Sequence, residues 1–385
     1  MTTRRVCVVI TARPSYSRVK SLLKAINNHD YLELQLVLAG SALLDRYGNA
    51  AKTIEADGFY VNEKIYNIIE GETSTGMAKT TGLAIMELST TFYNLKPHIV
   101  VTIADRFETL ATSISASYQN IPLAHIQGGE VTGNIDEKVR HANTKLADIH
   151  FVSTEEAKQR VIKLGEASHT VINTGCPSMD LAKEVLDDHK MEFDPIEKYG
   201  GVGDKISWKK GYLVVMQHPV TTEYEKSRLH ILETLLAITS LDIPTFWFWP
   251  NVDAGSDGTS KGIRQFREKG LTKNIYFFKN TDPKDFLILI KNSICLVGNS
   301  SAGIRECSFL GVPSVNIGTR QSKRERADNV LDCNYKSSEI INCIRKHIKS
   351  KHFRSSKIYG RGDSGIKIAD ELSRFKLRFH KTITY

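Results

Sequence analysis

The sequence lacks the cysteine patterns of disulfide-stapled and zinc-binding proteins. Only 6 of its 385 residues are cysteine, and they are scattered, with no C-x-x-C pair and no histidine at zinc-ligand spacing. At about 150 residues per domain, the chain is long enough for two or three domains with their own cores. We therefore expect reduced, partly buried cysteines and no metal site.

Long hydrophobic runs are also absent. The longest apolar stretch, around residues 34–44, is interrupted by polar and glycine residues and falls short of a membrane span. The apolar run at residues 6–10 is too short for a signal-peptide core and carries no cleavage-site pattern. We expect a cytoplasmic protein without a membrane partner.

The charge balance favours an anionic partner without naming it. The 52 Lys and Arg residues exceed the 43 Asp and Glu residues, which gives a net charge of +9. Nucleic acid, a membrane surface and a phosphorylated metabolite all fit such a charge. We disfavour nucleic acid, because the sequence has no recognised nucleic-acid-binding motif and its cations follow expected strands.

Short runs rich in Val and Ile alternate with longer amphipathic segments, as in βαβ units with a parallel sheet covered on both faces. The expected strands of the first half are residues 5–11, 33–38, 98–103, 122–126 and 150–152, with a helix over 17–27. Those of the second half are 212–216, 244–249, 275–278, 295–297 and 313–317. The pattern predicts an α/β protein with two Rossmann-like domains.

The alternation is broken once, at residues 187–210, which are rich in Gly and Lys and suit a linker. We therefore expect an N-terminal domain over residues 1–186 and a C-terminal domain over 211–365. A C-terminal helix at about 366–385 is expected to pack back onto the first domain. Two such domains imply a central cleft, and ligands are expected at the loops after the strands.

Three loops in the first half carry candidate groups. Arg13 lies where a strand leads into a helix N-terminus that can bind an anion, with an ordinary surface arginine as the alternative. Asp105 with Arg106 and, after the next strand, Glu130 follow strand ends that lie at one edge of a parallel sheet. Two carboxyl groups there can divide acid and base roles. A simple helix cap at Asp105 is the alternative.

A helix is expected to open at Asp136 and Glu137. Glu137, Arg140 and His141 fall three or four residues apart and so share one face. That face is either part of the site or an ordinary solvated surface.

Two loops of the second half offer polar groups. His218 follows the first strand, at the edge where ligands bind, and Asn251 belongs to the polar loop 250–256 after an aromatic strand. A structural histidine and a plain turn are the alternative interpretations.

The strongest phosphate-binding candidate is the loop 298–303. Ser300 and Ser301 follow a strand and open a helix, so that hydroxyls and backbone N–H groups converge where a diphosphate fits. The loop 318–326 then places four cations, Arg320 among them, just past another strand end.

In this order the motifs resemble those of the hydrolysing UDP-N-acetylglucosamine 2-epimerases, including the epimerase half of the mammalian bifunctional epimerase/kinase of sialic acid synthesis. The resemblance covers nearly the whole chain. It rests on Arg13 and on residues 39–41, 105–107, 128–131, 135–137, 140–141, 217–221, 250–256, 298–301, 318–321 and 356–360.

The resemblance implies a GT-B-type arrangement, a nucleotide-sugar substrate, no cofactor and a homodimer or tetramer. Such enzymes eliminate UDP to leave a 2-acetamidoglucal and then add water to give free N-acetylmannosamine. By match, the catalytic candidates are Asp105, Glu130, Asp136 and His218, without a choice of the base at C2. The substrate-binding candidates are Arg13, Arg106, Gln127, Arg140, Asn251, Ser300, Ser301, Glu306 and Arg320, with Glu306 on the ribose.

Two departures from the mammalian pattern leave the sugar open. Pro14 and Ser15 stand where the mammalian enzyme has Ala-Asp, and Gln127 stands where it has glutamate. Bacterial relatives act on UDP- or GDP-linked diacetamido-trideoxyglucose in legionaminic acid synthesis, and this is the alternative substrate.

Two other enzyme classes compete. A non-hydrolysing 2-epimerase resembles this fold, but its usual loop reads Glu-Ala-Gly-Leu-Arg where residues 127–131 read Gln-Gly-Gly-Glu-Val. A GT-B glycosyltransferase needs no base at C2, so the carboxylates argue against it.

Overall fold

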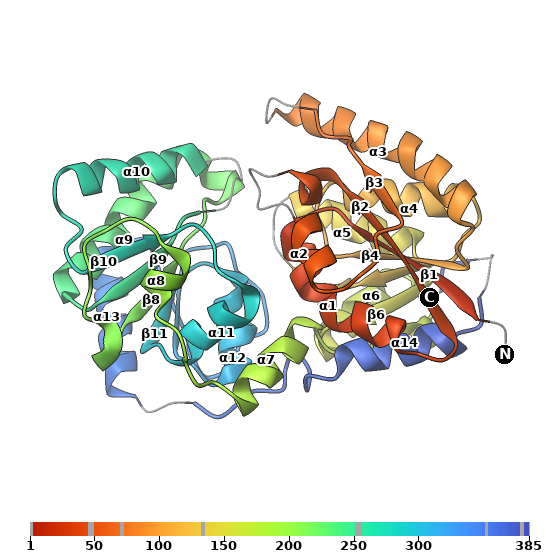
Figure 1. Cartoon of the computed structure of the whole chain (residues 1–385). Helices are drawn as coiled ribbons and strands as arrows, with labels where there is room; N and C mark the ends of the chain where they lie inside the picture. The colour runs from red at the N-terminus through yellow and green to blue at the C-terminus, as the bar shows by residue number, and fades with distance from the viewer. Residues whose placement is uncertain are drawn as a thin grey trace. The chain divides into compact units, whose positions relative to one another are not determined.

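The computed structural model describes residues 3–44, 50–69, 73–131, 135–250, 256–350, 353–377 and 381–384 (Figure 1). The chain divides into two compact units. Unit 1 comprises residues 1–130, 135–180 and 359–385, and unit 2 comprises residues 131–134 and 181–358. The C-terminal end of the chain therefore returns to unit 1.

Unit 1 is built on a seven-stranded parallel sheet with the order β3-β2-β1-β4-β5-β6-β7. Its strands are β1 (Arg4–Ile10), β2 (Leu32–Ala39), β3 (Glu63–Ile65), β4 (Ile99–Ile103), β5 (Leu123–Ile126), β6 (Ile149–Val152) and β7 (Val171–Asn173). Every residue of β4, β5 and β6 is buried. Strands covered on both faces read as continuous apolar runs, which is why the Val- and Ile-rich pattern marked them.

Helices cover both faces of this sheet. One face packs against α1 (Arg13–Asn27), α2 (Ala50–Ala56) and α14 (Ser364–Arg374). The other packs against α3 (Ser74–Leu95), α4 (Thr109–Tyr118) and the end of α5 (Ile135–Leu146). The remaining helices are η1 (Gly40–Leu43), α6 (Glu155–Lys163), η3 (Ser168–Thr170) and α7 (Ser178–Asp187), the last of which continues into unit 2.

The C-terminal segment packs against the rest of unit 1 at several points, of which α14 and Lys381 are two. Helix α14 lies against α1 so closely that a Cβ at Gly365 would approach the Ser21 carbonyl carbon to 2.7 Å. Further on, Lys381 donates to backbone carbonyls at the C-terminus of α5, including that of Lys145 at 2.8 Å. Cations are stabilised at a helix C-terminus, because backbone carbonyls there lack partners.

Lys381 also belongs to a charge cluster, which we call the Glu166 cluster and which consists of the buried Glu166 and His150 and the partly exposed side chains of Lys145 and Lys381. Both lysine ammonium groups lie 2.7 Å from the Glu166 carboxylate, and His150 Nε2 lies 3.1 Å from it. Burial raises the pKa of Glu166, but the three hydrogen bonds outweigh it and lower the pKa to about 2. The glutamate is therefore anionic.

Unit 2 is built on a six-stranded parallel sheet with the order β10-β9-β8-β11-β12-β13. Its strands are β8 (Leu213–Met216), β9 (Thr245–Phe248), β10 (Ile275–Phe278), β11 (Cys295–Gly298), β12 (Ser314–Ile317) and β13 (Val330–Cys333). One face packs against α9 (Ser227–Leu241), α10 (Ser256–Glu268) and α13 (Ser337–Lys349). On the other face Phe248 contacts Phe286 of α11 (Pro283–Lys291).

The remaining helices of unit 2 are short: α8 (Pro195–Tyr199), η4 (Trp208–Lys210), η5 (Thr221–Lys226), η6 (Ser301–Gly303) and α12 (Glu306–Leu310). Two of them, α8 and η4, lie within the segment 187–210 that the sequence predicts as a linker. The structure places this segment in unit 2, where the Val202 N–H bonds the Phe277 carbonyl at 3.0 Å. Among the described residues, no helix is both long and apolar enough to cross a membrane.

In each sheet the strand order reverses once, between β1 and β4 in unit 1 and between β8 and β11 in unit 2. Open parallel sheets bind ligands beside such a reversal, outside the carboxyl ends of the strands. The loops after these four strands are therefore where a site is expected.

Candidate active site

Arg13 is the first residue of α1 and follows β1 directly. The helix begins four residues earlier than the sequence predicts, because Pro14 fits the first turn, where its missing N–H costs no hydrogen bond. Arg13 is half-buried. The structure thus places a cation at a helix N-terminus beside the strand reversal, which suits an anionic group.

Arg140 brings together the loops that follow β4 and β5. Its guanidinium forms an ion pair with the Asp105 carboxylate, and its Nη1 donates to the Glu130 carbonyl at 2.7 Å. Arg140 is buried, whereas the Asp105 side chain keeps 15% exposure. The arginine therefore holds Asp105 at an accessible position and fixes the backbone of Glu130.

The Glu130 side chain is buried, with its Oε1 accepting a hydrogen bond from Ser153 Oγ at 3.0 Å. Asp136 lies half-buried in the first turn of α5, the helix that also carries Arg140. On the same helix, His141 lies 3.5 Å from Glu137. Asp105 and Glu130 lie on the two loops that Arg140 contacts, and Asp136 lies on the helix that carries Arg140. The structure thus places all three candidate carboxyl groups on segments that Arg140 connects.

Arg106 and Gln127 both have partners within the protein. Arg106 forms a bidentate ion pair with the buried Glu108, with both N···O distances at 3.2 Å. Gln127 is buried and turned inward, with its amide nitrogen 2.9 Å from Cys176 Sγ and its oxygen 3.5 Å from Arg18. Sequence reasoning did not single out Cys176 or Arg18, since nothing in either segment marks them.

In unit 2 the backbone of His218 is clamped by Asn299. The Asn299 side chain accepts from the His218 N–H at 2.7 Å and donates to the His218 carbonyl at 2.8 Å. Burial, and secondarily the charge of Arg320, lowers the pKa of His218 to about 3. The imidazole is therefore neutral and serves as a hydrogen-bonding group. Asn299 joins the loops after β8 and β11.

The serine loop follows β11 at the strand reversal. Ser300 caps η6 by accepting from the Ala302 N–H at 3.3 Å, and Ser301 accepts from Arg305 at 3.0 Å. A Cβ at Gly298 would approach the Met216 carbonyl oxygen to 2.1 Å, so only glycine lets the loop pass β8 this closely. Hydroxyls and a buried cation thus meet at one loop, as diphosphate binding requires.

Arg305 is a candidate diphosphate-binding residue that sequence reasoning missed. Its position one helical turn after Ser300 and Ser301 could have indicated that it lies beside them. Beside it, Glu306 Oε2 is buried and lies 3.9 Å from Arg305 Nε, an ion-pair distance, but accepts no hydrogen bond from the described residues. An acceptor left in this way fits a sugar hydroxyl. Arg320 donates to the Asn299 carbonyl at 3.3 Å. The predicted site residue Asn251 lies outside the described residues.

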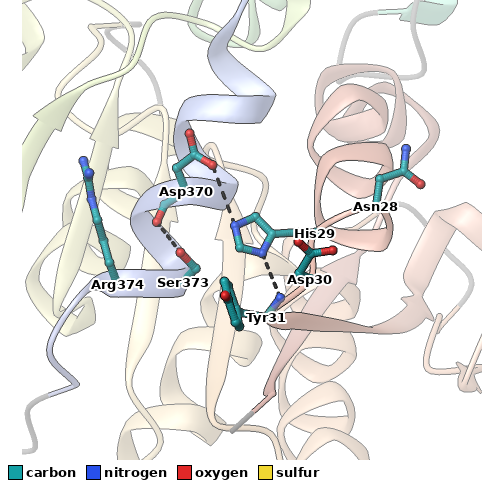
Figure 2. Close-up of a pocket in the computed structure, with 7 residues that line it drawn as sticks. All are labelled: Asn28, His29, Asp30, Tyr31, Asp370, Ser373 and Arg374. Atoms are coloured by element: carbon teal, nitrogen blue, oxygen red, sulfur yellow. Dashed lines mark hydrogen bonds and ion pairs between the residues drawn. The ribbon is translucent and has the colours of Figure 1, made fainter. Parts of the chain in front are cut away.

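A surface pocket of about 450 Å³ lies elsewhere on unit 1 (Figure 2). It is formed by the loop after α1 and by α14, with His29 lying 3.7 Å from Asp370. That loop enters β2 at its amino end, so the pocket and Asp105 lie at opposite ends of the parallel strands. Within the described ranges, no cluster of three His, Cys, Asp or Glu side chains is placed to hold a metal ion.

Comparison with known proteins gives consistent matches. A family model described as UDP-N-acetylglucosamine 2-epimerase matches residues 24–373. The chain is 30% identical to the hydrolysing UDP-N,N'-diacetylbacillosamine 2-epimerase of Legionella pneumophila, over 93% of both chains. It is 28% identical to a UDP-N-acetylglucosamine 2-epimerase of Neisseria meningitidis, over 94% of this chain and 92% of the other.

The fold is also similar to that of a solved structure, a UDP-N-acetylglucosamine 2-epimerase of Neisseria meningitidis bound to UDP-N-acetylglucosamine. The TM-score is 0.78 at 19% identity, with 96% of this chain and 99% of the other covered. The predicted fold class, two Rossmann-like domains of the GT-B type, is confirmed.

Proposed function

Because the chain belongs to the UDP-N-acetylglucosamine 2-epimerase family, we propose that it is a hydrolysing 2-epimerase. It converts UDP-N-acetylglucosamine, or a closely related UDP-linked 2-acetamido sugar, into the free mannose-configured sugar and UDP. The observation that carries the proposal is the ion pair of Arg140 with Asp105, together with the bond from Arg140 to the Glu130 backbone.

In the first step a carboxylate takes the proton from C2. The electrons of that C–H bond form the C1=C2 double bond, and the C1–O bond to the diphosphate breaks, which leaves a 2-acetamidoglucal and UDP. A base must be anionic, and the ion pair with Arg140 favours the anionic form of Asp105. We assign this step to the pair Asp105 and Glu130.

In the second step water adds to the glycal. Its oxygen bonds to C1 and gives up one proton to an unprotonated carboxylate, while a protonated carboxyl group delivers a proton to C2 on the face opposite to the one that lost a proton. Inversion thus requires two proton-transfer groups on opposite faces, and Asp136 is the third carboxyl group available. Glu130, held by Ser153, is part of this machinery.

The leaving diphosphate is stabilised by unit 2. Ser300, Ser301, Arg305 and Arg320 supply hydroxyl and cationic donors, and neutral His218 supplies an imidazole. Donors aimed at the charge that develops as a bond breaks lower the barrier directly. Glu306 accepts from the ribose, and Arg13 meets an anionic group at the N-terminus of α1.

The similarity to the Legionella enzyme, which its name describes as hydrolysing, supports hydrolysis over simple epimerisation. The same similarity favours a second candidate substrate, a UDP-linked 2,4-diacetamido-2,4,6-trideoxyglucose, with the GDP-linked form as a further alternative. Pro14, Ser15 and Gln127 are then the first residues to test for sugar selection.

The experiment is product analysis by NMR in deuterated water, with each nucleotide sugar supplied separately. We expect UDP to appear in step with a free mannose-configured sugar that carries deuterium at C2. An epimerised nucleotide sugar as the sole product would contradict hydrolysis. Free sugar that keeps its configuration and its proton at C2 would contradict C2 chemistry altogether.

The matched variants are Glu130→Gln and Glu137→Gln. Glu130→Gln is expected to lower turnover at least roughly 100-fold, in the range of general acid–base catalysis, while UDP affinity stays unchanged. Glu137 pairs with His141 on the same helix, so Glu137→Gln is expected to keep its turnover. Equal turnover in the two variants would remove Glu130 from the mechanism.

The proposal includes a homo-oligomer. Helix α3 exposes Leu83, Met86 and Tyr93 at helical spacing, with Met86 68% and Tyr93 73% exposed. A large apolar stripe on a surface helix is typical of a subunit interface. Sedimentation of Met86→Lys, compared with the unaltered protein, tests it, and the variant is expected to shift toward the monomer.

We also place the protein in the cytoplasm. None of the six cysteines, all of which lie within the described ranges, forms a disulfide bond, as is typical of a reducing compartment. Fractionation of the cells that produce it tests this placement.

A further inference from the structure

Two residues at the carboxyl ends of β4 and β5 have a left-handed backbone although they are not glycine. They are Ala104, with φ 61°, and Gln127, with φ 66°. This conformation costs an L-residue roughly 1–2 kcal/mol, so it persists only where neighbouring groups hold it. Ala104 immediately precedes Asp105, and its conformation sets the direction in which that carboxylate leaves the strand.

The Ala104 N–H donates to the Ile126 carbonyl at 2.9 Å, and the side chain that lies nearest to the Ala104 carbonyl is His125, in the middle of the neighbouring strand β5. Its Nε2 lies 3.0 Å from the Ala104 carbonyl oxygen, and its Nδ1 lies 3.1 Å from Thr144 Oγ1. His125 is fully buried. Burial lowers the pKa of His125 to about 3, although the bond to Ala104 acts to raise it, so the ring is neutral.

The neutral ring has one N–H, and the partners decide where it is. A carbonyl oxygen can only accept, so the proton lies on Nε2 and is donated to Ala104. Nδ1 then accepts from the Thr144 hydroxyl. Every polar atom of the His125 ring is thereby satisfied, and the ring has one favoured orientation.

The same buried group supports the loop that carries Glu130. A Cβ at Gly128 would lie 2.9 Å from Thr144 Oγ1 and 3.1 Å from His125 Nδ1. The backbone of this loop therefore packs directly against the hydrogen-bonded side chains of His125 and Thr144. Asn143, beside Thr144 on α5, also points to the Ala104 carbonyl, at 3.4 Å, and donates to Thr109 Oγ1 at 2.8 Å. Asn143 and Thr144 of α5 therefore contact the groups that hold both the loop after β4 and the loop after β5.

We propose that His125 is a positioning residue: through its Nε2–H it holds Ala104 in the left-handed conformation and so aims Asp105 at the reacting sugar. The role in turnover rests on the proposed function. His125 has no exposed surface and touches no substrate, so it acts only through the turn.

The test combines His125→Leu with Ala104→Gly. Leucine removes the donor, and we expect kcat to fall roughly 100-fold, the loss that a displacement of about 1 Å produces, with KM changed less than about threefold. Glycine adopts positive φ without strain, so adding Ala104→Gly should recover at least about tenfold of that loss. His125→Gln, which keeps an N–H, should retain more activity than His125→Leu.

The matched control is His347→Leu in unit 2. His347 is also buried and bonds a backbone carbonyl, that of Ser314 at 3.1 Å, but no left-handed residue depends on it. We expect a similar loss of thermal stability with kcat within about twofold. A comparable kcat loss in this control, or no recovery by Ala104→Gly, would overturn the proposal.

Two measurements keep the test decisive. If His125→Leu does not fold, Thr144→Val removes only the hydroxyl, and a folded Thr144→Val protein with unchanged kcat would overturn the proposal. Hydrogen exchange of the segment 104–110 is independent of turnover. It should accelerate in His125→Leu but not in His347→Leu, and equal protection in both would also overturn it. Absence of turnover in the unaltered protein would instead refute the proposed function.

Discussion

The contact most open to measurement is the ion pair of Arg140 with Asp105. Arg140 is buried, and the Asp105 side chain is only 15% exposed. In Arg140→Met the apolar stem is kept, but the carboxylate loses its partner and the Glu130 carbonyl loses its donor. Removing one partner of a buried pair costs about 3–5 kcal/mol, and partial exposure of Asp105 places the expected loss at about 3 kcal/mol.

A double-mutant cycle separates this interaction from the packing of the arginine. Asp105→Asn alone leaves a buried guanidinium opposite a neutral amide and is expected to cost about 2 kcal/mol. In the double variant neither charge is left unpaired, so the combined loss should fall short of the sum by roughly 2 kcal/mol. If the two side chains did not interact, the losses in unfolding free energy of the two single variants would simply add in the double variant.

The assay exploits the distribution of tryptophan. All 3 tryptophans, Trp208, Trp247 and Trp249, lie in unit 2, whereas helices of both units contribute to circular dichroism. In urea we expect the circular-dichroism transition of unit 1 to move down by about 1.5 M, taking a slope of about 2 kcal/mol per M, while the fluorescence transition stays in place. An unmoved circular-dichroism transition, or an additive cycle, would refute the argument.

Two further predictions concern charges outside this pair. Arg305→Gln should weaken UDP binding at least about tenfold by calorimetry, because Ser301 loses a charged donor worth roughly 1.5–3 kcal/mol, and unchanged affinity would contradict the assignment of the serine loop. The pKa of Glu166 is depressed from 4.5 to about 2, so its stabilisation is complete above about pH 4.5 and is lost as pH falls toward 2. Lys381→Met should therefore move acid unfolding to higher pH, and the exposed Lys376→Met should not; identical acid midpoints would contradict the role of the Glu166 cluster.

The central strands could be predicted from sequence because burial on both faces leaves them almost purely apolar. Three strands were not predicted, β3, β7 and β13, which all lie at sheet edges and are three or four residues long. These three strands are only partly buried, so their sequences mix polar and apolar residues and resemble loops, whereas the edge strand β10 is fully buried and was predicted.

The positions of the site loops could likewise be predicted, but not the direction of each side chain. Gln127 was expected to bind substrate, and the structure turns it toward Cys176 through a left-handed backbone that glycine usually signals and glutamine does not. His125, Thr144 and Asn299 act through partners distant in sequence. A single sequence shows which residue stands at each of these positions, but not which distant residue it forms a hydrogen bond with.

In both units a buried side chain from the neighbouring loop or strand bonds the backbone beside the central strands. His125 bonds the Ala104 carbonyl in unit 1, and Asn299 bonds both the N–H and the carbonyl of His218 in unit 2. A buried polar group that loses its partner costs about 1–3 kcal/mol, so each bond disfavours other loop conformations by that amount. Under the proposed function, rigid loops of this kind keep the candidate base of unit 1 and the diphosphate-binding groups of unit 2 from reorganising within their own units, as electrostatic stabilisation of an elimination requires.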